Sequence, residues 1–201
     1  MSKIGILGGT FNPIHNGHIA LAKAAYEQFA LDKVILISSG MSYFKKDIIM
    51  PSKEHRYNMT KLACDNYTYF EASDIEKKKE GYSYTYETLN DLSLIYPDSD
   101  FYYIIGADTL FSITSWKNPE VIFNMCTLLV AVRDDVITDD LINRSNELKH
   151  AYNANIELIN FNRIDLSSTE LRKKIVDKKD VSEYIPNNVL EYINKNNLYS
   201  N

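Results

Sequence analysis

The sequence has little cysteine and no long apolar segment. Its 201 residues include two cysteines, Cys64 and Cys126, and both stand in apolar surroundings. We therefore expect two reduced core thiols rather than a disulfide framework, as is usual in a reducing compartment. No apolar run approaches the roughly 18 residues of a membrane span, and no charged-then-apolar leader precedes the first apolar segment. We expect a cytoplasmic protein with no membrane partner.

Positive charge is also scarce. The chain has 22 Lys and Arg residues against 27 Asp and Glu residues, and its net charge at pH 7 is −5. A protein that binds nucleic acid through a bulk positive field needs the opposite balance, so we expect no nucleic-acid partner. A local basic pocket for a small anion remains compatible with this composition.

The sequence shows no internal repeat, linker or low-complexity segment. At 201 residues it is long enough to bury a substantial core. We expect a single domain over residues 1–201, with the last roughly 35 residues forming C-terminal helices that pack on it.

Three common ligand-binding motifs are absent. The chain contains no Gly-Lys-Ser/Thr tripeptide, which excludes a Walker-type loop. It also lacks the Gly-x-Gly-x-x-Gly fingerprint of dinucleotide-binding dehydrogenases, and its second apolar segment ends in Ile37-Ser38-Ser39 rather than in an acidic residue. A zinc site needs three or four clustered ligands, whereas the candidates are scattered without ligand spacing: Cys64, Cys126, His55 and His150.

The sequence does contain a glycine-rich turn with two histidines, Gly-Gly-Thr-Phe-Asn-Pro-Ile-His-Asn-Gly-His, at residues 8–18. It stands between an apolar run at 4–7, typical of a strand, and an amphipathic run at 19–30, typical of a helix. Gly8 and Gly9 carry no Cβ, so an anion is able to approach the backbone N–H groups there.

The end of this turn adds donors for the same anion. Gly17 and His18 fall near the start of the following helix, where unpaired N–H groups and the helix dipole favour negative charge. His15 and His18 are three residues apart, so both rings are able to face one ligand and donate to phosphate oxygens. We therefore predict a phosphate-binding turn, and two merely solvated histidines are the weaker interpretation.

Strand-like and helix-like patterns alternate along the whole chain. This alternation predicts an α/β fold, with a Rossmann-like doubly wound parallel sheet and helices on both faces. In such sheets ligands bind beyond the carboxyl ends of the strands. The expected strands are at residues 4–7, 34–37, 69–72, 101–105, 127–132 and 156–159.

Several polar or aromatic residues follow the predicted strands, and each has an ordinary alternative role. Lys45 or Lys46 is placed to meet a phosphate, although spacing alone favours a solvated lysine pair. Asp108, after Gly106 at the end of a strand, is able to accept hydrogen bonds from ribose hydroxyls or to cap the next helix. Trp116, the single tryptophan, is a packing residue or a platform that stacks on a heteroaromatic ring.

A second candidate anion site begins a helix near the C-terminus. Ser167 and Glu170 have the spacing of a capping box, which accounts for both residues without any ligand. The same helix start favours an anion, and Ser168, Thr169 and Arg172 add hydroxyl donors and a fixed cation within one turn.

Two local expectations concern the segment before the predicted helix at 83–96. The charged run at 74–81 mixes both signs and predicts a solvated loop. Ser83 suits the N-cap position of the helix.

These motifs resemble those of a known enzyme family. The turn resembles the Gly-Gly-Thr-Phe-Asp-Pro-(Ile/Leu)-His-x-Gly-His signature of the nucleotidyltransferases that need no covalent intermediate, with Asn12 where Asp is more frequent. Residues 166–172, Leu-Ser-Ser-Thr-Glu-Leu-Arg, resemble their Ile-Ser-Ser-Thr-x-(Ile/Leu)-Arg signature. Ser-Tyr-Thr-Tyr-Glu-Thr at 83–88, Gly-Ala-Asp at 106–108 and Trp116 resemble the bacterial nicotinate mononucleotide adenylyltransferases, and the likeness extends over nearly the whole chain.

The resemblance implies a specific reaction. It implies that AMP passes from ATP to nicotinate mononucleotide by direct in-line attack, giving nicotinate adenine dinucleotide and pyrophosphate in NAD biosynthesis. Mg²⁺ is expected with ATP, held mainly by its phosphates and water and not by protein ligands. The attacking phosphate is already an anion, so catalysis depends on positioning and on neutralising charge.

The resemblance also implies roles for individual residues. The catalytic residues would be His15, His18, Lys45 and Arg172. The ATP-binding residues would be Gly8, Gly9, Thr10, Phe11, His15, Gly17, His18, Gly106, Asp108, Ser167, Ser168, Thr169 and Arg172. The residues that bind the nicotinate nucleotide would be Gly8, Thr10, Lys45, Thr85, Trp116 and Arg133.

Two alternatives stay open. Another superfamily member would act on nicotinamide mononucleotide, phosphopantetheine or a cytidylyl acceptor. A non-catalytic nucleotide sensor would use the same fold, although His15, His18 and Arg172 together argue against it. The sequence leaves the oligomeric state open, with a homo-oligomer among the options.

Overall fold

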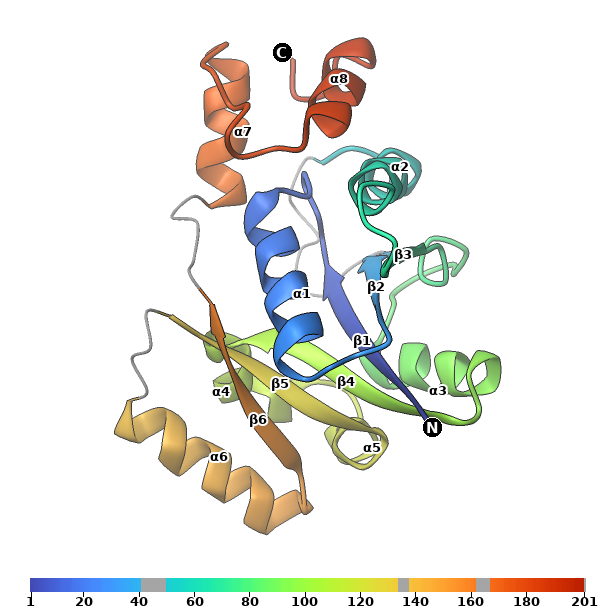
Figure 1. Cartoon of the computed structure of the whole chain (residues 1–201), viewed down its shortest axis with the longest axis vertical. Helices are drawn as coiled ribbons and strands as arrows, with labels where there is room; N and C mark the ends of the chain where they lie inside the picture. Colours follow the sequence, from blue (N-terminus) through green and yellow to red (C-terminus); the bar gives the residue numbers. More distant parts are fainter. Residues whose placement is uncertain (41–49, 134–137, 162–166, 201) are drawn as a thin grey trace.

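The computed structural model describes residues 1–40, 50–133, 138–161 and 167–200. Within them, six strands form one parallel sheet in the order β3-β2-β1-β4-β5-β6 (Figure 1). This order and direction confirm the predicted Rossmann-like sheet. The strands are β1 (Ser2–Gly9), β2 (Lys33–Ser38), β3 (Phe70–Ser73), β4 (Ser99–Gly106), β5 (Cys126–Arg133) and β6 (Asn155–Phe161).

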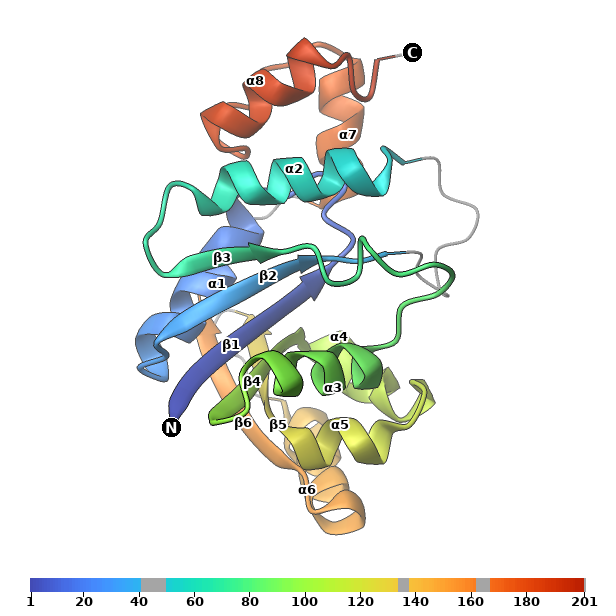
Figure 2. The same cartoon turned by 90° about the vertical axis from the view of Figure 1, so that its right-hand side faces the viewer.

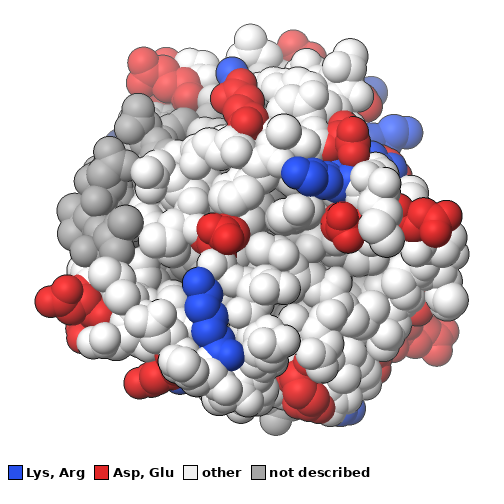
Figure 3. Space-filling view, turned by 60° about the horizontal axis from the view of Figure 1, so that its bottom comes forward, with Lys and Arg blue, Asp and Glu red and all other residues white. Residues whose placement is uncertain are grey.

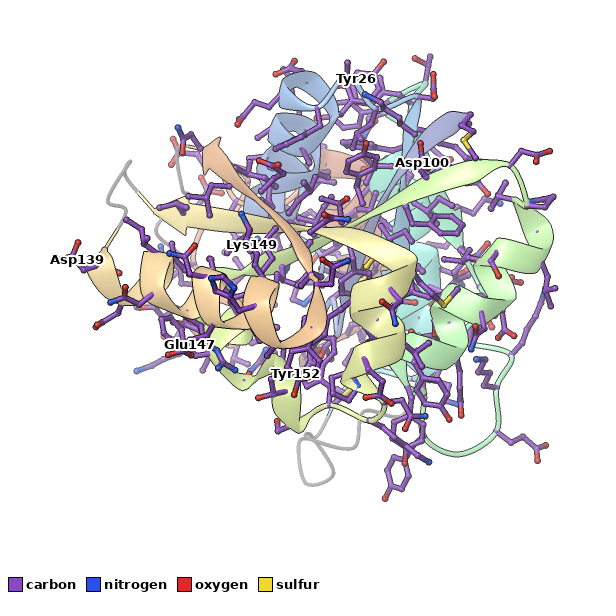
Figure 4. The ribbon with its side chains drawn as sticks, turned by 90° about the horizontal axis from the view of Figure 1, so that it is seen from below. Tyr26, Asp100, Asp139, Glu147, Lys149 and Tyr152 are labelled. Carbon is purple, nitrogen blue, oxygen red and sulfur yellow. The ribbon has the colours of Figure 1, made fainter. Side chains whose placement is uncertain are left out.

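Helices cover both faces of the sheet, as the alternating pattern predicts. They are α1 (Asn16–Gln28), α2 (Lys53–Cys64), α3 (Thr85–Ile95), α4 (Ala107–Ser112), α5 (Pro119–Met125), α6 (Asp139–Tyr152), α7 (Ser168–Val176) and α8 (Asn187–Lys195), with a 3-10 turn η1 (Ile113–Ser115). Helices α1 and α2 lie on one face, and α3 to α6 lie on the other (Figure 2). Seen from below in Figure 4, α6 runs beside β6 from Asp139 to Tyr152.

The two-residue period of the strands divides the core into two layers. In β2, Ile35 and Ile37 belong to the core beneath α3, whereas Val34 and Leu36 belong to the core beneath α1 and α2. All four side chains are at most 1% exposed. Because both faces of each central strand are buried, the strands are continuously apolar rather than alternating.

The last two helices extend the layer formed by α1 and α2. Leu171 of α7 and Val189 and Ile193 of α8 are at most 1% exposed and belong to the same core as α1 and α2. Helix α8 packs against α2 (Figure 2). The Asn188 side chain donates a hydrogen bond to the Leu62 carbonyl oxygen over 2.6 Å. The C-terminal segment therefore reaches the same end of the sheet as the turn after β1.

The position of β1 explains where a ligand site should form. It pairs with β2 on one side and β4 on the other. The chain leaves β1 for α1 on one face and leaves β4 for α4 on the other face. Such a topological switch point opens a crevice beyond the carboxyl ends of the two strands. Both glycine-containing ends, Gly9 of β1 and Gly106 of β4, lie there.

Three further features concern the chain as a whole: its cysteines, its helix lengths and its surface charge. Cys64 and Cys126 are free and buried as predicted, and burial raises the pKa of each thiol to about 12. No described helix is long and apolar enough to cross a membrane. On the described part of the face in Figure 3, acidic and basic side chains are interspersed.

Candidate active site

The turn after β1 adopts a backbone that only a small residue at position 9 allows. Phe11 has a positive φ of 44° and is 2% exposed, so its ring folds back under the turn. A Cβ atom on Gly9 would lie 2.6 Å from this ring, and one on Gly8 would lie 2.8 Å from the Tyr103 hydroxyl. The two glycines therefore let the backbone pass between two aromatic side chains.

The two histidines of the turn lie side by side at the start of α1. Their ring centroids are 3.8 Å apart, and the His18 ring packs nearly perpendicular to the Phe11 ring, with centroids 5.0 Å apart. The His15 backbone N–H donates a hydrogen bond to His18 Nδ1 over 3.3 Å. In the neutral ring this bond places the proton on Nε2, which makes Nε2 the ring's donor.

A large cavity of about 690 Å³ opens on the β2 and α3 side of the turn. Gly8, Gly9 and Thr10 form one wall, and Thr85 at the start of α3 and Trp116 form the opposite side. The Tyr103 ring lies between these walls, edge-on to Trp116 with centroids 6.3 Å apart. Its hydroxyl lies 3.5 Å from Thr85 Oγ1, and burial raises its pKa, so Tyr103 is a neutral donor at physiological pH. A cavity of this size and lining suits a nucleotide with an aromatic ring.

The same cavity corrects two expectations about the segment before α3. Residues 74–81 form a loop, as predicted, with Lys78 and Glu80 exposed. Glu76 in this loop is half-buried instead: it lines the cavity and accepts a hydrogen bond from the Gly40 N–H over 3.1 Å and another from Thr88 Oγ1 over 2.9 Å. Ser83 is not the N-cap, because that position falls on Tyr84. The Ser83 hydroxyl is instead buried at the cavity without a hydrogen-bond partner in the described residues.

A smaller cavity of about 260 Å³ opens on the α7 side of the turn. His18, Ser168, Thr169 and Arg172 contribute its polar lining. The Arg172 guanidinium donates to the Asn12 carbonyl oxygen over 2.9 Å and to Thr169 Oγ1 over 3.0 Å, which fixes its orientation. Hydroxyls, an imidazole and a guanidinium form a donor set that binds phosphate oxygens.

The capping box at the start of α7 is present as predicted. Ser167 Oγ accepts a hydrogen bond from the Glu170 N–H over 3.2 Å, and Glu170 Oε2 accepts one from the Ser167 N–H over 2.9 Å. Ser167 therefore serves the helix, while the next two residues face the smaller cavity.

Thr10 lines both cavities. A ligand in the larger cavity and a ligand in the smaller cavity would therefore meet at the glycine turn, next to His18. This arrangement suits a transfer between two bound molecules rather than the binding of one.

Comparison with known proteins identifies the family of the chain. Residues 6–174 match the model of the cytidylyltransferase-like family. A protein of Lachnoclostridium phytofermentans named "Probable nicotinate-nucleotide adenylyltransferase" is 38% identical over 199 residues, covering 99% of this chain and all of that protein. A protein of Clostridium beijerinckii with the same name is 37% identical, again over 99% of this chain and all of the relative. The chain belongs to the nicotinate-nucleotide adenylyltransferase family.

A solved structure of a similar protein supports the fold. The nicotinic acid mononucleotide adenylyltransferase of Plasmodium falciparum, complexed with NaAD, superposes with a TM-score of 0.77. Its sequence is 23% identical, and the match covers 99% of this chain and 98% of the other. The two chains therefore share the Rossmann-like fold over nearly their whole length.

Some residues expected from the adenylyltransferase motifs are placed away from both cavities or outside the described part. Lys45 falls in 41–49, outside the described residues, and the Arg133 side chain does as well, although β5 ends at Arg133. Gly106 and Asp108 lie at the junction of β4 and α4, beside the large cavity's Thr109. Three other expected residues lie at the start of α1 and of α7 rather than in the lining of either cavity: His15, Gly17 and Ser167.

Sequence reasoning missed other residues that the adenylyltransferase fold brings to the site. Arg56 is 2% exposed and donates to the carbonyl oxygens of Thr10 and Gly40 over 2.9 and 3.1 Å. Burial lowers the pKa of this guanidinium. Tyr103 and Lys117 line the large cavity, and Lys117 Nζ lies 4.4 Å from the centre of the Tyr84 ring. The strand period places Tyr103 beside β1. Arg56 falls in a predicted helix, at a position where the family commonly has Arg, but its contact with a turn 46 residues away depends on tertiary packing.

Proposed function

We infer that this chain transfers the adenylyl group of ATP to nicotinate mononucleotide, releasing pyrophosphate and forming nicotinate adenine dinucleotide, a step of NAD biosynthesis. The observation that carries this proposal is the junction of two unlike cavities at Thr10, beside the imidazole of His18. Membership of the nicotinate-nucleotide adenylyltransferase family supports the same reaction.

The large cavity is assigned to nicotinate mononucleotide. Trp116 presents its indole to the cavity and would stack on the pyridine ring. Thr85 would hold the nucleotide, with Gly8 and Thr10 close to its phosphate. Two more positions, Lys45 and Arg133, are proposed as cationic contacts of this substrate from the family motifs.

The small cavity is assigned to the phosphates of ATP. Ser168, Thr169 and Arg172 would bind the pyrophosphate part at the start of α7, with Ser167 fixing the helix end. The remaining proposed ATP contacts are the turn residues Gly8, Gly9, Thr10 and Phe11, the helix-start residues His15, Gly17 and His18, and the ribose-binding pair Gly106 and Asp108.

The chemistry follows from these positions. A phosphate oxygen of nicotinate mononucleotide forms a bond to the α-phosphorus of ATP, and the bond from that phosphorus to the bridging oxygen breaks as pyrophosphate leaves. No base is needed, because the attacking phosphate is already an anion. His18 would donate from Nε2 to the α-phosphoryl oxygens, with His15 beside it, while Arg172 and Lys45 neutralise charge on the phosphates.

Mg²⁺ is proposed to enter with ATP. The described lining of the small cavity offers hydroxyls, an imidazole and a guanidinium, which bind phosphate oxygens rather than a hard cation. Mg²⁺ would therefore be held by ATP phosphates and water. When bound, it neutralises charge on the phosphates during transfer.

The test is pyrophosphate release from ATP and Mg²⁺, measured in parallel with nicotinate mononucleotide, nicotinamide mononucleotide and phosphopantetheine. A strong preference for the nicotinate acceptor, abolished by EDTA and restored by excess Mg²⁺, is the expected result. Equal or reversed rates with the nicotinamide acceptor would keep the reaction and overturn the substrate. If no acceptor caused pyrophosphate release although the protein bound ATP, a nucleotide sensor would be favoured.

A further inference from the structure

Three residues distant in sequence hold residues 10–12, two through backbone carbonyl oxygens and one through the Asn12 side chain. Arg56 of α2 donates to the Thr10 carbonyl oxygen over 2.9 Å. Arg172 of α7 donates to the Asn12 carbonyl oxygen over 2.9 Å. The third contact comes from the C-terminal segment, where the Tyr199 hydroxyl donates to Asn12 Oδ1 over 2.9 Å.

Asn12 connects the C-terminal segment to the ATP cavity. It is 5% exposed and lines the small cavity together with Arg172. Its side chain is bonded to Tyr199 and its carbonyl oxygen to Arg172, so the hydroxyl and the guanidinium are held by one residue. A shift of Asn12 would move both the turn and the cation that faces the phosphates.

The conformation of Tyr199 indicates that this contact is maintained at a cost. Its φ of 64° lies in the left-handed region, which is unfavourable for a residue with a bulky side chain. Burial raises the pKa of its hydroxyl, although nearby Arg172 and Arg56 oppose the rise. The hydroxyl is therefore protonated at neutral pH and remains a donor to Asn12.

Docking of the C-terminal helix does not explain the contact. Val189 and Ile193 already bury α8 in the core. The Tyr192 hydroxyl also joins α8 to α2, 3.0 Å from His55 Nδ1 and 3.1 Å from Asn58 Nδ2. Tyr199 lies beyond the end of α8, and its hydroxyl contacts the phosphate-binding turn instead of α2.

We propose that Tyr199 is a positioning residue for adenylyl transfer, acting through Asn12 to set the backbone of the phosphate-binding turn and the orientation of Arg172. This inference rests on the proposed function, since it assigns the C-terminal segment a part in binding and transferring the ATP phosphates. It gives the segment after α8 a part in the active site through Tyr199.

The test compares Tyr199→Phe with Tyr192→Phe as a matched control. Both changes remove one hydroxyl from the C-terminal segment, but only Tyr199→Phe removes a bond to the turn. For Tyr199→Phe we expect kcat/KM for ATP to fall about 3- to 10-fold, the range for one lost hydrogen bond, with the acceptor KM unchanged. For Tyr192→Phe we expect a lower Tm and unchanged kinetics.

A double-mutant cycle with Asn12→Ala separates a direct effect from a general one. If Tyr199 acts through Asn12, adding Tyr199→Phe to Asn12→Ala causes no further loss of kcat/KM. Additive losses, unchanged kinetics in Tyr199→Phe, or a Tyr199→Phe protein that is unfolded would each overturn the positioning role. Inactivity of the wild-type chain with all acceptors would overturn the proposed function instead, so the two failures are distinguishable.

Discussion

The two cavities that meet at Thr10 are built from different kinds of residue. The larger one is lined by aromatic rings and hydroxyls, including Tyr84, Tyr103 and Trp116, which come from three separate segments. The smaller one is lined by the beginnings of two helices, with His18 at the start of α1 and Arg172 within α7. In the proposed reaction the first lining would recognise the shape of an aromatic ring, and the second would stabilise negative charge.

This difference teaches where selectivity and rate should reside. Charge stabilisation at a helix start acts on any phosphate, so the smaller cavity should govern turnover with every acceptor. Stacking and hydroxyl contacts act on the part of the substrate that differs between acceptors, so the larger cavity should govern the choice of acceptor. Changes in the two cavities should therefore alter different kinetic constants.

The largest effect is expected from His18→Ala. Loss of the Nε2 donor should lower kcat about 10²- to 10³-fold with both pyridine nucleotides, because the imidazole stabilises charge that develops during transfer. KM for ATP should change little. Steady-state kinetics with saturating acceptor measure this, and an unchanged kcat would remove His18 from the mechanism.

The next largest effect is expected from Arg172→Met. The guanidinium is oriented by Asn12 and Thr169 toward the small cavity, so its removal should lower kcat/KM for ATP about 10- to 100-fold. Arg172→Lys keeps the positive charge but not the paired N–H donors of the guanidinium, so it should recover part of the loss. If Arg172→Met raised the KM for the acceptor as much as the KM for ATP, the division of roles between the two cavities would be contradicted.

The small cavity could be predicted from the sequence almost completely. A glycine turn followed by a helix, and a capping box followed by hydroxyls and Arg172, are local patterns that place donors at a helix start, where an anion is favoured. The sheet could also be predicted, because buried parallel strands leave continuous apolar runs such as 34–37. In both cases the residues that act together are close in the chain.

The large cavity could be predicted only in part. Trp116 and Thr85 were expected from family motifs, and the structure places them in its lining. Glu76 was expected in a solvated loop because its neighbours are charged, but a hydrogen bond to Gly40 brings it to the cavity. Tyr199 and Arg56 reach the turn through tertiary packing across many residues, which no local pattern encodes.

The expectation that residues 1–201 form one catalytic domain stays a prediction.

A smaller, acceptor-specific effect is expected from Trp116→Leu. Loss of stacking on the pyridine ring should raise the KM for nicotinate mononucleotide about 10-fold, with KM for ATP unchanged. Trp116→Phe keeps an aromatic face and should retain most of the affinity. If Trp116→Leu instead raised KM for ATP as much as for the acceptor, the indole would belong to both subsites, and the comparison between the cavities would fail.

The smallest effect is expected from Lys117→Met. This change tests most directly whether the large cavity selects the acceptor by charge. Lys117 brings a positive charge to the rim of the large cavity, where Glu76 contributes a carboxylate to the lining. The nicotinate acceptor carries a ring carboxylate that the nicotinamide acceptor lacks, so loss of this exposed charge should reduce the preference for nicotinate about 2- to 5-fold.

The control for this change is Lys117→Arg, which keeps the charge and should keep the preference. Higher salt should narrow the gap between wild type and Lys117→Met, because screening weakens the interaction of exposed charges. A preference that is unchanged in Lys117→Met at low salt would mean that backbone donors of the cavity, rather than this side chain, read the carboxylate. Selectivity would then reside in the backbone geometry of the large cavity, and the charge of Lys117 would have no part in the choice of acceptor.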